Sequence, residues 1–146
     1  MVEISPSLDL WGELFSPREA TSATGLVLCD ANEPGELGTV GRYRGIPVPY
    51  GAASLEPPAT VAAADRLGWL LAAATPHVDT LRGQGAELWR LHLDVRYQAQ
   101  CNLEFSPEEV AAVAALRVPL TVTCWEDTEG CSPDAEPGAA ADGGGM

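Results

Sequence analysis

The residues best suited to chemistry are His92 and Asp94, which are separated by one residue in a stretch that alternates between apolar and polar side chains. On a strand both would point to the same side, where an imidazole and a carboxylate can interact. With Thr121 or Thr123 on a neighbouring strand, they would complete a nucleophile, a base and an orienting acid. No nucleophile-elbow motif accompanies them, and an internal threonine lacks the N-terminal amine that activates it. We therefore interpret the pair as a solvated or cross-strand ion pair and predict no catalytic residue.

The residue types that bind metals are present but do not cluster in the sequence. The four cysteines are Cys29, Cys101, Cys124 and Cys131. Cys124 and Cys131 are separated by six residues, the two histidines lie far apart, and neither a C-x-x-C nor an H-x-x-x-H motif occurs. We predict no metal site and no cofactor, and we interpret the cysteines as reduced thiols. A disulfide between Cys29 and Cys101, which both lie near predicted strand ends, stays open as an alternative.

A glycine-rich segment at 35–41 is the remaining chemical motif. Its three glycines are spaced as in a loop, but it carries an acidic residue and lacks the Lys-Ser/Thr pair of a phosphate-binding loop. It also does not join a strand to a long helix, as a dinucleotide fingerprint does. We interpret it as a flexible connection.

The charge of the chain limits its partners. Its 8 basic residues, all arginine, face 21 acidic ones, which gives a formal net charge of −13. Such a chain repels phosphate backbones and anionic lipid, so we expect no nucleic-acid partner and no membrane partner. A basic protein partner is the complementary expectation. Since residues 1–4 show no basic, apolar leader pattern and no apolar run of about 18 residues occurs, we expect a cytoplasmic protein.

Three stretches alternate with the period of a half-buried strand. Apolar residues occupy even positions in 2–10, odd positions in 89–97 and even positions in 118–124. If these residues point inward, the opposite parity forms one exposed sheet face. The candidate binding residues on that face are Trp11, Arg90, His92, Asp94, Arg96 and Trp125.

Exposed tryptophan beside arginine is typical of protein-binding hot spots. Our first hypothesis is therefore a non-enzymatic interaction module, such as an immunity or accessory protein, that binds a basic partner through this face. The alternative is a small-molecule-binding or catalytic domain. Its pocket would lie between the sheet and the 30–58 loop and would gather His92, Asp94 and Arg96 with Tyr43 or Tyr50. A homodimer that packs through the same face, and coverage of the tryptophans by the loop, also stay open.

The elements that position this face come from an internal repeat. Phe-Ser-Pro-x-Glu occurs at 15–19 and again at 105–109. Serine at the N-cap, proline at N1 and glutamate at N3 predict helices that begin at Pro17 and Pro107. Gly25 would end the first helix, and the second would end before Pro119. Between the repeats, an Ala- and Leu-rich helix is expected from 60 to 75, kinked by Pro76 and continuing to about 82.

Two strand–helix–strand halves joined by a helical connector predict an α+β protein with a ferredoxin-like antiparallel sheet and helices packed on one face. We expect a single domain over 1–126, with halves at about 1–58 and 59–126. Short strands are expected around 38–43 and 46–50. A disordered acidic tail is expected over 127–146.

This pattern resembles the bacterial family of domains of unknown function that is numbered 4279. The similar segments are Phe15 to Leu26, Gly68 to Arg82 and Leu91 to Asp127. They are a capped helix that ends at a glycine, a Pro-interrupted Leu-rich helix, and a final strand–helix–strand unit. The family carries no established activity, so the resemblance implies a small α+β fold and, by analogy of fold, an immunity or partner-binding role.

Overall fold

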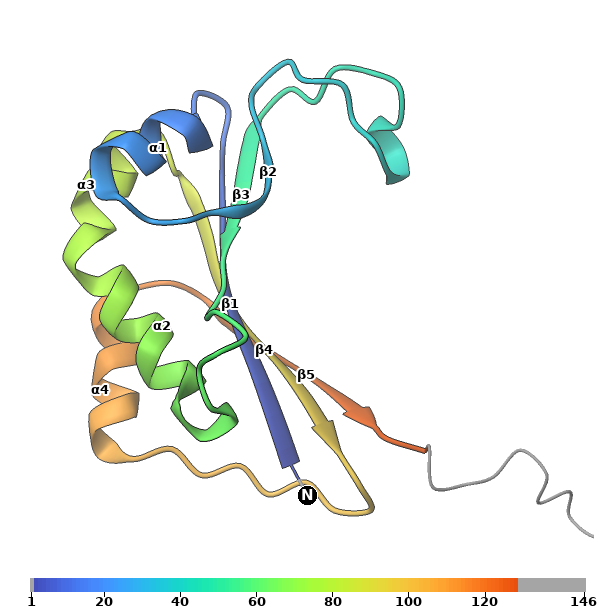
Figure 1. Ribbon diagram of the computed structural model, residues 1–146, viewed down its shortest axis with the longest axis vertical. Coiled ribbons are helices and arrows are strands. Elements are labelled where there is room, and N and C mark those ends of the chain that lie inside the picture. The colour runs from blue at the N-terminus through green and yellow to red at the C-terminus, as the bar shows by residue number, and fades with distance from the viewer. Residues whose placement is uncertain (1, 129–146) are drawn as a thin grey trace, which may run out of the picture.

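The computed structural model describes residues 2–128 and arranges them in two layers, a sheet and a set of helices on one side of it (Figure 1). The strands are β1 (Val2–Gly12), β2 (Cys29–Asn32), β3 (Gly51–Leu55), β4 (Leu88–Tyr97) and β5 (Leu120–Glu126). The α-helices are α1 (Pro17–Thr24), α2 (Arg66–Ala74), α3 (Val78–Gly83) and α4 (Pro107–Leu116). The tail predicted for 127–146 lies outside the described residues from position 129 onward, and so does Cys131.

The five strands lie in the order β2-β3-β1-β4-β5. The central strand β1 is antiparallel to β3 and to β4, and β2 is antiparallel to β3, but β4 and β5 run parallel. The predicted α+β class and the placement of the helices on one face are confirmed. The predicted antiparallel sheet is wrong, because the sheet is mixed.

The two halves differ in how their strands meet. In the first half β3 lies between β1 and β2, as in a split β-α-β unit. In the second half no strand enters between β4 and β5, so α4 acts as a simple crossover that brings β5 back beside β4 in the same direction. A ferredoxin-like sheet would require a strand between them. The strand order therefore differs from the ferredoxin-like one.

The helix starts predicted from the repeat are confirmed at Pro17 and Pro107. The Ser16 hydroxyl accepts a hydrogen bond from the backbone N–H of Glu19, and the Ser106 hydroxyl accepts one from that of Glu109. Only the second repeat closes the full capping box, because the Glu109 carboxylate also accepts from the Ser106 N–H.

The predicted connector helix is shorter than its composition suggests. A 3₁₀ turn, η2 (Ala63–Asp65), precedes α2, so the α-helix begins at Arg66 rather than near residue 60. Pro76 interrupts the helix as expected. It lies in a second 3₁₀ turn, η3 (Thr75–His77), after which α3 continues to Gly83.

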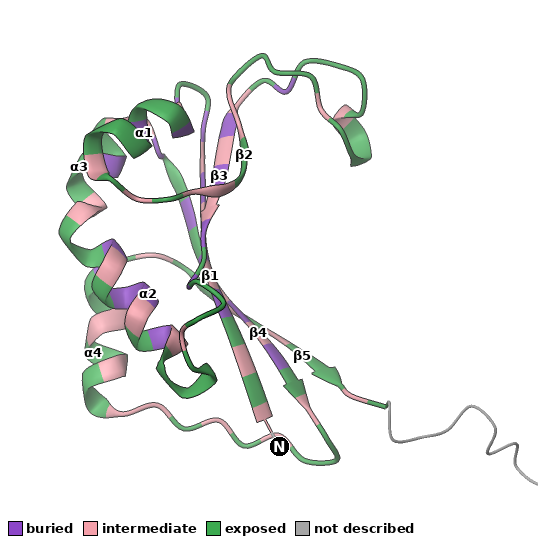
Figure 2. Cartoon of the chain, viewed as in Figure 1, coloured by how far each residue is buried: buried purple, intermediate pink, exposed green. Residues whose placement is uncertain are grey.

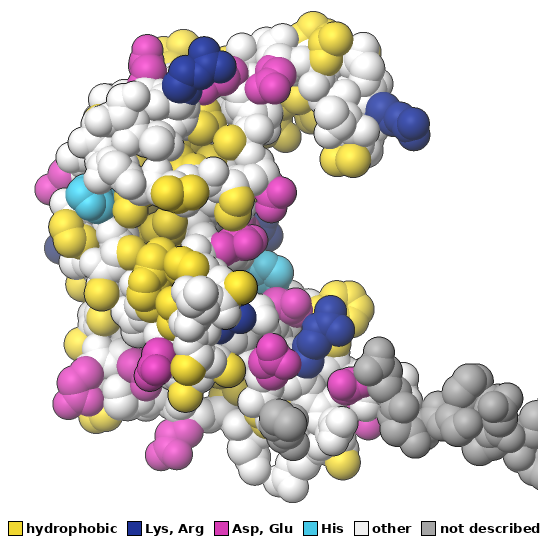
Figure 3. All heavy atoms as spheres, in the orientation of Figure 1, with side chains coloured by type: hydrophobic (Ala, Val, Ile, Leu, Met, Phe, Trp, Pro, Cys, Tyr) yellow, Lys and Arg dark blue, Asp and Glu magenta, His cyan; other side chains and the backbone are white. Residues whose placement is uncertain are grey.

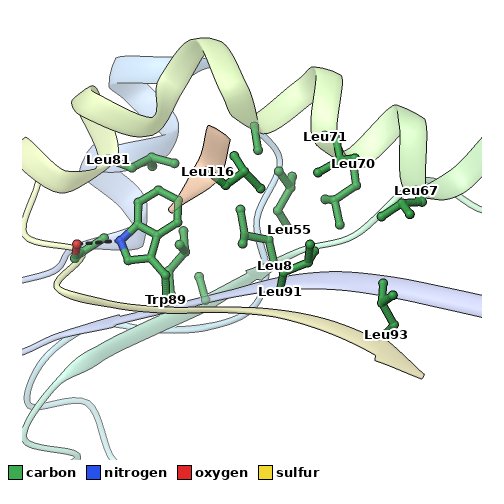
Figure 4. Close-up of a cluster of buried hydrophobic side chains, with 14 of the residues drawn as sticks. Leu8, Leu55, Leu67, Leu70, Leu71, Leu81, Trp89, Leu91, Leu93 and Leu116 are labelled. Carbon is green, nitrogen blue, oxygen red and sulfur yellow. Dashed lines mark hydrogen bonds between the residues drawn. The ribbon is translucent and has the colours of Figure 1, made fainter. Parts of the chain in front are cut away.

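The core lies between the helices and the sheet (Figures 2 and 4). Alternate residues of β1 and β4 are fully buried there against leucines of α2 and α3. Trp89 also points into this layer, and its indole N–H donates to the Ala86 carbonyl oxygen at 2.8 Å. The paired indole explains why this large ring is buried to 6% exposure without an unsatisfied donor.

The burial predicted for the last strand is wrong, although its residues face the predicted sides. Leu120 and Val122 face the helix side, as their pairing with Leu91 and Leu93 requires, but they are 46% and 41% exposed. Cys124 is also exposed. These residues lie on an edge strand, where the helix layer covers one flank alone.

Residues 33–50 form an arm that leaves the sheet between β2 and β3 and bends away from the helices (Figure 1). The strands predicted around 38–43 and 46–50 are replaced by two isolated bridges, Leu37 with Pro47 and Gly38 with Arg44, and by the 3₁₀ turn η1 (Gly41–Tyr43). The regular strands lie at the base of the arm instead. Among residues 2–128, no helix combines the length and apolar character needed to cross a bilayer.

Candidate functional site

The face of the sheet that the helices leave uncovered, called here the open face, carries all six candidate binding residues. Strand register sets them in rows. Trp11 of β1 lies across from Leu88 of β4, and Arg96 lies across from Trp125 of β5. The polar residues of the open face between these two ends are Ser5, Ser7, Asp9, Arg90, His92, Asp94, Thr121 and Thr123. Alternation in the sequence therefore indicated the right side chains for this face.

At one end of the open face, three strands contribute to a polar and aromatic cluster. The guanidinium of Arg90 lies 5.1 Å from the centre of the Trp11 ring, in a cation–π arrangement. Its Nε is 4.0 Å from a carboxylate oxygen of Asp9, and the Ser54 hydroxyl donates to the other oxygen at 2.8 Å. Sequence reasoning missed Ser54, because its contact depends on the pairing of β1 with β3.

Beside this cluster lies a recess of about 610 Å³. Its apolar walls are Trp11, Tyr50, Leu88 and Pro119, and its charged lining consists of Glu13, Glu87 and Arg90. Leu88 is 66% exposed, whereas Trp11 is partly buried. The indole is therefore neither fully covered by the arm nor fully exposed. It forms one wall of the recess.

The middle of the open face is held by a hydrogen bond between strands. The Nε2 of His92 and the Oγ1 of Thr123 are 2.9 Å apart. Within the described chain no hydrogen bond or ion pair joins His92 to Asp94, so the predicted contact between imidazole and carboxylate is not formed. The threonine is diagonal to the histidine, since Thr121 is its direct neighbour in the register.

A second cavity, of about 360 Å³, opens where β3 leaves the edge of β1. Its polar lining comes from Ser5, Ser7, Glu56, Arg66, His92 and Asp94. Two buried atoms here have no hydrogen-bond partner, the Oδ1 of Asp94 and the Nε of Arg66. Buried polar atoms are rarely left unpaired, so they mark a place where water or a small ligand would fit.

The pocket expected between the sheet and the 30–58 loop is divided in the structure. His92 and Asp94 line the second cavity, whereas Tyr50 lines the recess beside Trp11. Tyr43 lies in the arm, where its ring meets that of Tyr50 edge to face at 5.8 Å between centres. The single pocket that would gather all of them is not formed.

At the other end of the open face, Trp125 is 57% exposed and sits beside Arg96 in the register. The space-filling view shows the molecule hollowed between the arm and this end of the sheet (Figure 3). The open face is therefore concave overall, with aromatic residues at both ends and polar side chains between them.

Comparison of the chain with protein-family models, curated proteins and solved structures finds no match. The resemblance to the family numbered 4279 therefore stays a prediction, and the function rests on the geometry of the open face.

Proposed function

We propose that the protein is a non-enzymatic interaction module that binds a basic protein partner with its open face. The observation that carries this proposal is the recess beside Trp11, in which aromatic and aliphatic walls are combined with the carboxylates of Glu13 and Glu87. Hot spots in protein interfaces have this composition, an aromatic anchor in a hollow with charged groups around it. A lysine or arginine side chain would place its stem on the walls and its charge at the carboxylates.

The charge of the whole chain favours the same kind of partner. A net charge of −13 attracts basic proteins over a distance and accelerates their association, an effect that salt weakens. Binding and neutralising a basic toxin or enzyme in the cytoplasm, as an immunity or accessory protein does, is the role that this chemistry fits.

A second candidate is the binding of a small polar molecule in the cavity lined by His92 and Asp94. It is favoured by the unpaired Oδ1 of Asp94 and Nε of Arg66, which offer one acceptor and one donor. Nucleophilic catalysis there has less support. The His92 imidazole does reach the Thr123 hydroxyl, as a base would, but among the described residues no hydrogen bond or ion pair joins it to Asp94 as the orienting acid.

The test is affinity capture with the full chain at low and moderate salt, followed by mass spectrometry and by titration with the purified partner. Trp11→Ala and Leu88→Ala should each weaken binding at least tenfold. Val110→Ala is the matched control, since Val110 is 55% exposed on the helix side of the molecule. The proposal fails if no stoichiometric basic partner is found, or if the two recess variants bind it as tightly as the control.

A further inference from the structure

At the ends of β2 and β3 that lie away from the arm, three side chains bring metal-binding atoms together. The sulfur of Cys29 and one carboxylate oxygen each of Asp30 and Glu56 all lie within 4.8 Å of one another. Cys29 and Asp30 open β2, and Glu56 directly follows β3. Cys29 is paired with Ser54 in the register, which brings the end of β3 alongside the thiol. The cluster thus joins two neighbouring strands.

The backbone of β2 is shaped so that two consecutive residues serve this one cluster. In a regular strand, Cys29 and Asp30 would point to opposite faces. Asp30 has a φ of 49°, in the left-handed region, and the pairing of β2 with β3 shifts register between Cys29 and Asn32. An irregularity of this kind re-aims a side chain, and here it brings the Asp30 carboxylate to the side of the thiol.

The carboxylates of the cluster form no ion pair with any described residue, although Arg66 lines the same cavity as Glu56. Of the described residues, Arg90 and Asp9 alone form a salt bridge, so neither Asp30 nor Glu56 has a cationic side chain within 4 Å. The Cys29 thiol is partly buried and donates to the Ser54 carbonyl oxygen at 3.2 Å. Burial and the charges of Glu56 and Asp30 raise its pKa to about 11. A bound cation would compensate both carboxylates.

We propose that Cys29, Asp30 and Glu56 form a binding site for a zinc ion. Zinc binds thiolate at about 2.3 Å and carboxylate at about 2.0–2.2 Å, so tetrahedral ligand atoms lie roughly 3.5 Å apart. The three atoms lie within 4.8 Å of one another, so binding would require the side chains to rotate until they reach that spacing. Three protein ligands leave the fourth position to water. Calcium and magnesium are disfavoured, because they require more oxygen ligands and do not select sulfur.

Binding at this site exchanges a proton for the metal. The Cys29 thiol loses its proton to solvent as the bond between sulfur and zinc forms, and no oxidant or reductant takes part. Because the thiol is almost fully protonated at neutral pH, the apparent affinity should rise about tenfold for each pH unit. A site built from carboxylates alone would show almost no such dependence between pH 6.5 and 7.5.

The test uses the full chain with Cys101, Cys124 and Cys131 replaced by serine, so that Cys29 is the sole thiol. Titration with cobalt should produce the near-ultraviolet absorption of a cobalt–thiolate bond, and zinc should displace it. In this background Cys29→Ser should abolish the absorption, and Glu56→Gln should weaken zinc binding at least tenfold by calorimetry. Glu104→Gln, an exposed acid elsewhere in the chain, is the matched control and should change neither measurement.

Three results would each overturn the proposal. They are the absence of a cobalt–thiolate band in the chain that keeps Cys29, unchanged zinc affinity in Glu56→Gln, and an affinity that does not vary with pH. Circular dichroism of each variant without metal shows that any loss of binding is not a loss of fold. The outcome is independent of the recess, because Trp11→Ala should bind zinc as the parent chain does.

Discussion

The guanidinium of Arg90 is shared between the ring of Trp11, 5.1 Å away, and the carboxylate of Asp9, at 4.0 Å. The arginine side chain is 45% exposed and that of the aspartate 18% exposed. Because the arginine is open to water, the pair adds little stability, but the contact with Arg90 holds the indole as a wall of the recess. The contacts of Arg90 with Trp11 and Asp9 therefore affect the shape of the open face more than the stability of the fold.

Replacing Arg90 by alanine should separate its effect on stability from its effect on partner binding. We expect Arg90→Ala to change the free energy of unfolding by less than about 1 kcal/mol. The arginine is 45% exposed, Asp9 keeps the Ser54 hydroxyl as a donor, and the cation–π contact is weak in water. Partner affinity should fall, since the indole loses the contact that holds it. Urea denaturation and calorimetry measure the two quantities. A large loss of stability with unchanged affinity would show that Arg90 serves the fold.

Replacing Trp125 of the open face and replacing the buried Trp89 should have opposite effects on partner binding and on stability. Trp125→Ala should weaken binding of the partner by about 2 kcal/mol and leave stability nearly unchanged, because the side chain is 57% exposed. Trp89→Ala should destabilise by about 3–5 kcal/mol, since it empties a buried site and leaves the Ala86 carbonyl without its donor. Binding titrations and thermal unfolding of both variants provide the comparison.

Much of this surface could be predicted from the sequence, because alternation fixes which face a side chain takes. The parity of residues 89–97 placed Arg90, His92 and Asp94 on the open face, and the register agrees. Alternation does not indicate whether other elements cover a given face of the sheet. The exposure of Leu120 and Val122 follows from the edge position of β5, which depends on strand order.

Contacts that depend on strand pairing could not be predicted from the sequence. The parallel direction of β5 is set by the α4 crossover, and period-two patterns are the same in both directions. Cys29 and Glu56 meet because β2 pairs with β3, in a region where the expected strands were misplaced. Ligand motifs read along the chain do not find a cluster of this kind.

Alanine substitutions at two glycines should change stability in opposite directions, because the space beside Gly51 is filled and the space beside Gly68 is open. A β-carbon on Gly51 would collide with the carbonyl oxygen of Phe15, whereas one on Gly68 would meet no atom within 4 Å. Gly51→Ala should destabilise by more than about 3 kcal/mol, because backbone would have to move. Gly68→Ala should stabilise by about 0.5–1 kcal/mol through helix propensity. Equal effects in urea denaturation would contradict the close approach at Gly51.

The two copies of the Ser-Pro-x-Glu repeat should differ in energy. Ser106→Ala should cost about 1–2 kcal/mol, because it breaks a reciprocal capping box, and Ser16→Ala should cost less, about 0.5–1 kcal/mol. Chemical denaturation of the two single variants measures the difference. A larger loss at Ser16 would mean that tertiary contacts of α1 outweigh the cap.

The raised pKa of Cys29 makes stability depend on pH at the alkaline end. In the folded chain this pKa is about 11, against an ordinary value of 9.0, because of burial and the nearby Glu56 and Asp30 charges. The folded state therefore holds the thiol proton more tightly than the unfolded state does. This contribution is complete below pH 9 and is lost as the pH rises through 11. Without metal, Cys29→Ser should lose less stability than the parent chain between pH 9 and pH 11. Unfolding free energies over that range measure it, and parallel curves for the two proteins would contradict the assignment. Zinc should reverse the dependence, because the bound thiolate no longer competes for a proton.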